Sequence, residues 1–145
     1  MTLFKEMVYS TEVNIEVLVD EVYKGYRYFI MSYGQYPCAY VVLEEWHFCY
    51  EKQCDSINVS CHGGITYSEF GFRGFGKPRL VENKYWVIGW DYCHYSDFHG
   101  TWLTKEDDDY LRVKSKKWTT QEIVDEAKSV IEQLDFIYDN TRVYA

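Results

Sequence analysis

One segment of this chain has helical periodicity, and it comes last. Thr119 and Glu122 have the spacing of a capping box, in which each side chain binds the backbone N–H of the other residue. Apolar residues then recur at helical intervals, at Ile123, Ala127, Val130, Ile131, Leu134 and Ile137. A helix with one apolar face is stable only when another layer covers that face. We therefore expect a C-terminal amphipathic helix that packs on a sheet.

The residues before this helix have strand patterns. Residues 11–22 alternate apolar and polar side chains, which predicts a strand with one buried face. Further strands are expected at 27–33, 38–43, 57–61 and 65–70, and the apolar run 85–90 is typical of a central strand. Loops are expected at 71–81 and 92–117. The predicted fold is α+β: an antiparallel sheet of five to six strands with the helix on one face, in a single domain spanning 1–145.

Charge and composition exclude several classes of protein. The net charge of −8 argues against a direct nucleic-acid binder and against binding to anionic membranes. No apolar run approaches the roughly 18 residues that a membrane span needs, and the first residues lack the features of a signal peptide. Five cysteines, an odd number, fit reduced thiols in a cytoplasm. Fifteen tyrosines, eight phenylalanines and five tryptophans exceed what one core of this size absorbs, so we expect surface aromatics and a homo-oligomer.

The stretch CHGGITYSEFGFRGFGKP, residues 61–78, is the first candidate for a site. Gly63 and Gly64 free backbone N–H groups for anion binding, and Thr66 and Arg73 add a hydroxyl and a positive charge. Nearby phenylalanines offer flat faces on which a base can stack. The spacing and following helix of a P-loop are missing. The stretch therefore has two interpretations, one wall of a nucleotide pocket or a flexible hairpin tip.

Two histidines are the second candidate. If the strands that precede them are neighbours, His62 and His94 meet at one sheet edge, with Asp91 and Asp97 nearby. Two imidazoles can transfer the protons of a phosphodiester cleavage, and an aspartate can fix the tautomer of each ring. The alternative gives both aspartates turn-forming roles, and we assign Asp97 to that group. The predicted ligand-binding residues are His62, Gly63, Gly64, Thr66, Arg73, Trp90, Asp91 and His94, with His62, His94 and Asp91 as the alternative catalytic set.

Metal and other cofactors are not expected. The chain has histidines and cysteines enough for zinc, but it has no C-x2-C pair. The spacings His47-x-Cys49 and Cys49-x4-Cys54 match no strong zinc template. Cys38, Cys61 and Cys93 are interpreted as small buried apolar residues.

Several motifs together resemble a family of small uncharacterised phage and prophage proteins. They are His62-Gly63-Gly64-Ile65-Thr66-Tyr67, the segment from Gly89 to Asp97 with its D-x-x-H-x-x-D pattern, Trp118-Thr119 at the helix start, and Cys38-Ala39-Tyr40-Val41. The similarity runs from about residue 23 onward, and residues 44–56 depart from the usual glycine- and proline-containing loop of the family. The resemblance implies a phage origin, and hence a place in the host cytoplasm, but no reaction.

Three functions are compatible with these features. The first hypothesis is an antagonist of host defence that binds and sequesters a nucleotide immune signal, of the ADP-ribose or cyclic-nucleotide type, without turnover. The second is a phosphodiesterase-type enzyme that cleaves such a signal with His62 and His94. The third is an acidic mimic of nucleic acid that inhibits a host nuclease or CRISPR effector through residues 6–21 and 105–109.

Overall fold

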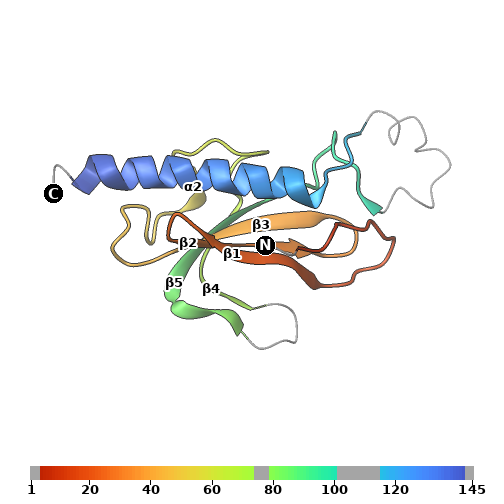
Figure 1. Cartoon of the computed structure of the whole chain (residues 1–145), viewed down its shortest axis with the longest axis horizontal. Coiled ribbons are helices and arrows are strands. Elements are labelled where there is room, and N and C mark those ends of the chain that lie inside the picture. The colour runs from red at the N-terminus through yellow and green to blue at the C-terminus, as the bar shows by residue number, and fades with distance from the viewer. Residues whose placement is uncertain (1–3, 74–78, 101–114, 143–145) are drawn as a thin grey trace.

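A computed structural model describes residues 4–73, 79–100 and 115–142. The chain forms one five-stranded antiparallel sheet and a long C-terminal helix that crosses one of its faces (Figure 1). The strands are β1 Glu16–Tyr23, β2 Tyr26–Ser32, β3 Pro37–Leu43, β4 Tyr67–Arg73 and β5 Arg79–Asp91, in the spatial order β1-β2-β3-β5-β4. The helix is α2, Thr120–Arg142, and a short 3-10 helix, η1, spans Cys54–Ser56. The α+β fold predicted from the sequence is confirmed.

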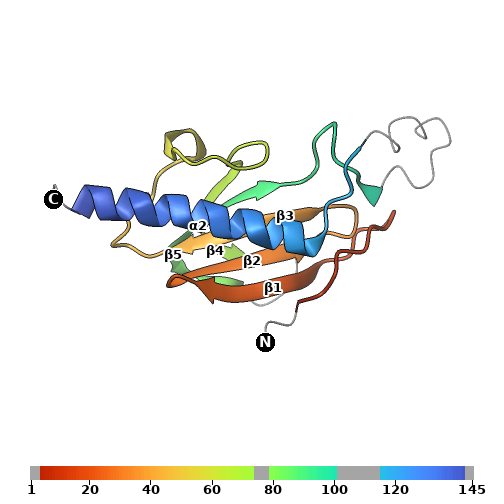
Figure 2. The ribbon, with the colours of Figure 1, turned by 45° about the horizontal axis from the view of Figure 1, so that its top comes forward.

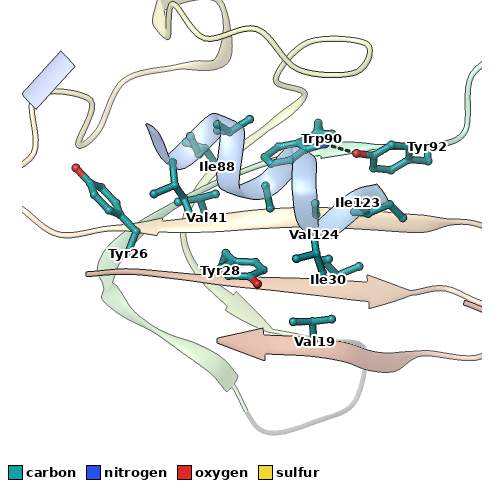
Figure 3. Close-up of a cluster of buried hydrophobic side chains, with 14 of the residues drawn as sticks. Val19, Tyr26, Tyr28, Ile30, Val41, Ile88, Trp90, Tyr92, Ile123 and Val124 are labelled. Carbon is teal, nitrogen blue, oxygen red and sulfur yellow. Dashed lines mark hydrogen bonds between the residues drawn. The ribbon is translucent and has the colours of Figure 1, made fainter. Parts of the chain in front are cut away.

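Helix α2 begins and packs as its sequence predicts. The Thr119 backbone N–H donates to Glu122 Oε1 at 3.0 Å, and the Glu122 N–H donates to Thr119 Oγ1 at 3.2 Å, which is the capping box. The predicted apolar face is fully buried from Ile123 to Leu134. It packs on β1, β2 and β3, in a core that includes Tyr28, Val41 and Trp90 (Figures 2 and 3).

The predicted strand at 57–61 is absent. Its backbone bonds to the helix instead, since the Ser60 N–H donates to Gln133 Oε1 at 2.7 Å and the Ser60 carbonyl accepts from Gln133 Nε2 at 2.9 Å. Ile57 is buried in the core between the sheet and α2. An extended segment alongside a helix also buries alternate residues, so its pattern imitates a strand.

The second face of the sheet carries a core of its own. Phe29 and Tyr40 of the central strands stack there with ring centroids 5.0 Å apart. Phe72 of β4 lies against both rings, at 4.9 and 4.6 Å, because the far end of the β4–β5 hairpin curls beneath the sheet (Figure 1). This explains why β2 and β3 are apolar on both faces, and it buries many of the aromatic residues.

A glycine in β4 allows this curl. The predicted loop at 71–81 is wrong at both ends, because strand residues lie at each end. The register shifts between Phe70 and Phe72, and Gly71 between them has φ +71°. A β-carbon there would lie 2.9 Å from the Val81 carbonyl oxygen, so the close approach of the two strands needs glycine. Strand β4 continues to Arg73 and β5 begins at Arg79, while residues 74–78 lie outside the described residues.

Candidate functional site

Three segments that are distant in sequence bring four side chains together beyond the end of β5. His62 comes from the turn before β4, His94 and Asp97 from the turn after β5, and Trp118 from the residues before α2. The His62 and His94 rings are edge to face with centroids 5.0 Å apart, and the Trp118 ring lies 4.9 Å from His62. The expectation that the two histidines share one end of the sheet is therefore met. We call these four residues the His–Asp cluster.

Asp97 is the centre of the cluster. Its Oδ2 lies 2.8 Å from His62 Nε2 and 3.1 Å from His94 Nδ1, and it also accepts from the His94 backbone N–H at 2.9 Å. Its Oδ1 accepts from the Trp118 indole N–H at 2.9 Å. The Asp97 side chain is only 1% exposed. Burial by itself would raise the pKa of this carboxyl, but the hydrogen bonds from His62, His94 and Trp118 outweigh burial and lower it below its ordinary value.

Gly63 fits against the His94 ring. It has φ +71°, and a β-carbon there would lie 2.3 Å from both Cε1 and Nε2 of His94. Gly64 also has a positive φ, +81°, but its β-carbon would meet nothing within 4 Å. Gly63 is therefore needed for both its backbone conformation and its lack of a side chain, and Gly64 for its conformation alone.

Residues of the sheet, of α2 and of the segment that follows β5 fix the position of His62 in the cluster. Tyr92, which is fully buried, stacks on His62 with ring centroids 4.9 Å apart and an angle of 6° between the planes. Its hydroxyl accepts from Trp90 Nε1 at 3.0 Å and donates to Glu126 of α2. Glu126 also accepts from the His62 backbone N–H at 3.2 Å. The helix and β5 thus fix both the position and the ring plane of His62.

Asp91 connects the cluster to a neighbouring pocket. Its Oδ2 accepts from Thr66 Oγ1 at 3.2 Å and its Oδ1 from the Cys93 N–H at 3.1 Å, while His94 Nε2 is 3.8 Å from Oδ1. The pocket has a volume of about 280 Å³ and lies where β5 ends and β3 and β4 begin. It is lined by Tyr36, Cys38, Tyr40, Thr66, Tyr67, Trp90, Asp91 and Cys93. Of the described residues in this lining, only Asp91 is charged.

The cysteines of this pocket are not activated nucleophiles. Burial raises the pKa of Cys38, and the Asp91 carboxylate adds to the effect. Burial and the same carboxylate also raise the pKa of Cys93. Because the thiolate is the reactive form, both groups stay unreactive near neutral pH.

The structure separates Arg73 from the other predicted ligand-binding residues. Tyr67 pairs with Gly89 near the pocket, whereas Arg73 pairs with Arg79 at the opposite end of the hairpin, about 20 Å along the strand. Trp90 is part of the pocket lining, but its side chain is 1% exposed and lies in the core under α2. His62, Gly63, Thr66, Asp91 and His94 lie close together, and of these five Thr66 and Asp91 line the pocket.

Sequence reasoning assigned Asp97 only a turn-forming role and gave Trp118 and Glu126 none. Asp97 does help to form a turn, since its N–H donates to the His94 carbonyl at 3.0 Å. The same side chain also binds both imidazoles. The D-x-x-H-x-x-D spacing was the available signal, because it places two carboxylates on either side of His94.

The acidic residues proposed as phosphate mimics are partly used within the fold. Glu16 pairs with Lys5 at 2.7 Å and Asp20 with Arg27 at 2.8 Å. Glu6 accepts from the Thr120 N–H at the start of α2. The second acidic segment, 105–109, lies outside the described residues.

Comparisons with known proteins give no family for this chain. No family model, no curated protein and no solved structure matches it. No described helix has both the length and the apolar character needed to cross a membrane.

Proposed function

We propose that this protein is an enzyme that cleaves a phosphoester bond in a small nucleotide-class molecule, with His62 and His94 as its catalytic residues. The observation that supports this most is the buried Asp97 carboxylate, which holds a nitrogen of each imidazole at 2.8 and 3.1 Å. The remaining ring nitrogens, His62 Nδ1 and His94 Nε2, have no hydrogen-bond partner among the described residues. Such oriented imidazoles are suited to activating a nucleophile.

The neighbouring pocket supports an aromatic substrate. The partly exposed Tyr36 and Tyr67 line it, and tyrosine rings are surfaces on which a base can stack. Asp91, between pocket and cluster, can accept hydrogen bonds from amino groups of a base. In the phage setting that the sequence resemblance implies, the substrate would be a host immune signal.

Charge favours cleavage over sequestration. A protein that only holds an anionic nucleotide is expected to line its pocket with lysine or arginine, because tight phosphate binding needs positive charge. Among the described residues the lining of this pocket has none, and Arg73 lies at the other end of the hairpin. Two imidazoles that are oriented by a buried carboxylate are suited to proton transfer in a cleavage reaction.

The test is to incubate the purified chain with candidate nucleotides, denature it, and analyse what is released. We expect altered products with the wild-type protein and none with His62→Ala or His94→Ala. Arg73→Ala is the matched control and should retain turnover, because Arg73 is far from the cluster. Release of an intact, retained nucleotide would instead support sequestration, and no retention or turnover across the panel would count against both.

A further inference from the structure

We infer that His62 Nε2, His94 Nδ1 and Asp97 Oδ2 form a binding site for one divalent transition metal ion of the zinc class. This departs from the expectation drawn from the sequence, in which Asp97 was not considered as a ligand. Metal binding rests on the geometry of the cluster, and its use in catalysis rests on the proposed function. In that use His62 and His94 act as ligands, and the metal-bound water takes the place of direct activation of the nucleophile by an imidazole.

The three residues converge as metal ligands do. One donor atom from each of His62, His94 and Asp97 lies within 4.8 Å of those of the other two, and Asp97 Oδ2 is 2.8 Å from His62 Nε2 and 3.1 Å from His94 Nδ1. Ligand atoms that bind zinc at about 2.0–2.1 Å in a tetrahedron lie roughly 3.3 Å apart. Shifts of a few tenths of an ångström would therefore bring the carboxylate to its distance from each ring nitrogen. Two imidazoles and one carboxylate are also the donor set of catalytic zinc sites, which keep a fourth position open for water.

Crowding at Asp97 is a second reason. Its Oδ2 faces three N–H donors, the two imidazoles and the His94 backbone, at 2.8 to 3.1 Å. A carboxylate oxygen has about two lone-pair sites, so a third donor is poorly accommodated. If one cation replaced the two ring protons, Oδ2 would have only two partners, the metal ion and the His94 backbone N–H.

The surroundings orient the ligands as metal sites require. The Trp118 indole N–H fixes the other oxygen of Asp97, and the Tyr92 ring fixes the plane of His62. With Nδ1 of His94 on a metal, its Nε2 would carry a proton, and Asp91 Oδ1 is 3.8 Å away to receive it with a small movement. A carboxylate that accepts from the outer nitrogen of a liganding histidine is common in metal sites.

A metal ion would add positive charge beside the two carboxylates. Asp91 and Asp97 are both acidic, and among the described residues no lysine or arginine lines the pocket. Lys116 lies 4.0 Å from the Trp118 ring but is paired with Glu122. A divalent cation at the cluster would attract a phosphoryl group and lower the pKa of its bound water. The hydroxide so formed attacks phosphorus, the bond to the leaving oxygen breaks with its electron pair, and that oxygen takes up a proton equivalent to the one the water released. Side-chain exposures of 22% for His62 and 35% for His94 show that both rings are partly open to water.

The test uses the tag-free chain after treatment with a chelator, titrated with Zn²⁺ in a calorimeter and with Co²⁺ by visible absorption. We expect one ion per chain, with Co²⁺ showing the intense bands of a low-symmetry four-coordinate site. Each of His62→Ala, His94→Ala and Asp97→Asn should weaken binding at least tenfold, since loss of even an outer-shell partner costs about 10–100-fold. Circular dichroism would confirm that each variant is folded.

Two controls separate this site from other ligands in the chain. Cys93→Ser removes the exposed thiol nearest the cluster, and His47→Gln removes a buried histidine that is bound to the Leu134 carbonyl. Both variants should bind Zn²⁺ and Co²⁺ like the wild type. Failure of the folded wild-type chain to bind either ion would overturn the inference, as would binding that survives loss of His62 and His94.

The same samples distinguish this inference from the proposed function. If the chain binds one metal ion at these residues but turns over no nucleotide, the metal site is supported and the proposed enzyme activity is refuted. If nucleotide cleavage persists in the chelator-treated chain, the enzyme activity is supported and the role of the metal is refuted.

Discussion

Two adjacent glycines give a matched test of how the His–Asp cluster is built. Both Gly63 and Gly64 have positive φ, so an alanine at either position carries the strain of the left-handed region, about 1–2 kcal/mol. Only Gly63 contacts His94, whose ring atoms would lie 2.3 Å from the new methyl group. That ring can move away only by giving up its bond to Asp97, which as a charge-assisted hydrogen bond contributes about 1.5–3 kcal/mol.

The expected losses of stability therefore differ. Gly64→Ala should lower the free energy of unfolding by about 1–2 kcal/mol, and Gly63→Ala by about 2.5–5 kcal/mol. For a chain of this size, these losses correspond to decreases in Tm of about 3–6 °C and about 8–15 °C. Urea denaturation and thermal melts of the two variants measure them, and Co²⁺ titration should show weaker binding in Gly63→Ala alone. Equal stability and equal metal affinity in the two variants would refute the packing of Gly63 against His94.

Three further predictions concern the helix and a buried histidine. Leu134→Ala should destabilise the protein by about 2–5 kcal/mol, because it leaves a cavity in the core. An unchanged urea midpoint would show that α2 does not contribute to that core. Thr119→Ala should cost about 1 kcal/mol through loss of the capping box, and equal stability of the variant and the wild type would show that the cap contributes nothing. Burial lowers the pKa of His47 below its ordinary value of 6.5, and its Nδ1 must stay unprotonated to accept from the Cys49 N–H. The unfolded chain therefore binds more protons, so stability should fall as the pH drops below about 6.5. The decrease in Tm between pH 7.5 and 5.5 should be smaller in His47→Gln than in the wild type. An identical decrease in the two proteins would contradict this.

The sequence predicts those parts of the fold that local periodicity determines. Helix α2 and its buried face follow from apolar residues at helical spacing. The apolar part of β5 is buried because this strand lies inside the sheet, between β3 and β4. The segment 57–61 misleads because an extended chain beside a helix alternates like a strand. Glycines at 71–76 suggest a loop, but Gly71 permits a bulge in a strand that continues.

The candidate site was predictable in its histidines and not in its centre. His62 and His94 do meet, but not through two neighbouring strands: His94 follows β5, whereas the segment before His62 lies along α2. Asp97 was assigned to a turn because aspartate in a turn and aspartate as a hydrogen-bond acceptor for two imidazoles have the same local sequence. Only the pairing of distant segments, which brings residues 62, 97 and 118 together, distinguishes the two roles.

The hydrogen bond from Trp118 to Asp97 also gives the molecule an internal reporter. The indole proton rests on a carboxylate that is 1% exposed and bound to both histidines, so it can exchange with water only when the cluster opens. Its NMR resonance is distinct from every backbone amide, and its chemical shift senses the charge on Asp97. One proton of one tryptophan therefore records, in a single spectrum, whether the segments that carry His62, Asp97 and Trp118 are together, how often they separate, and whether a cation has entered between them.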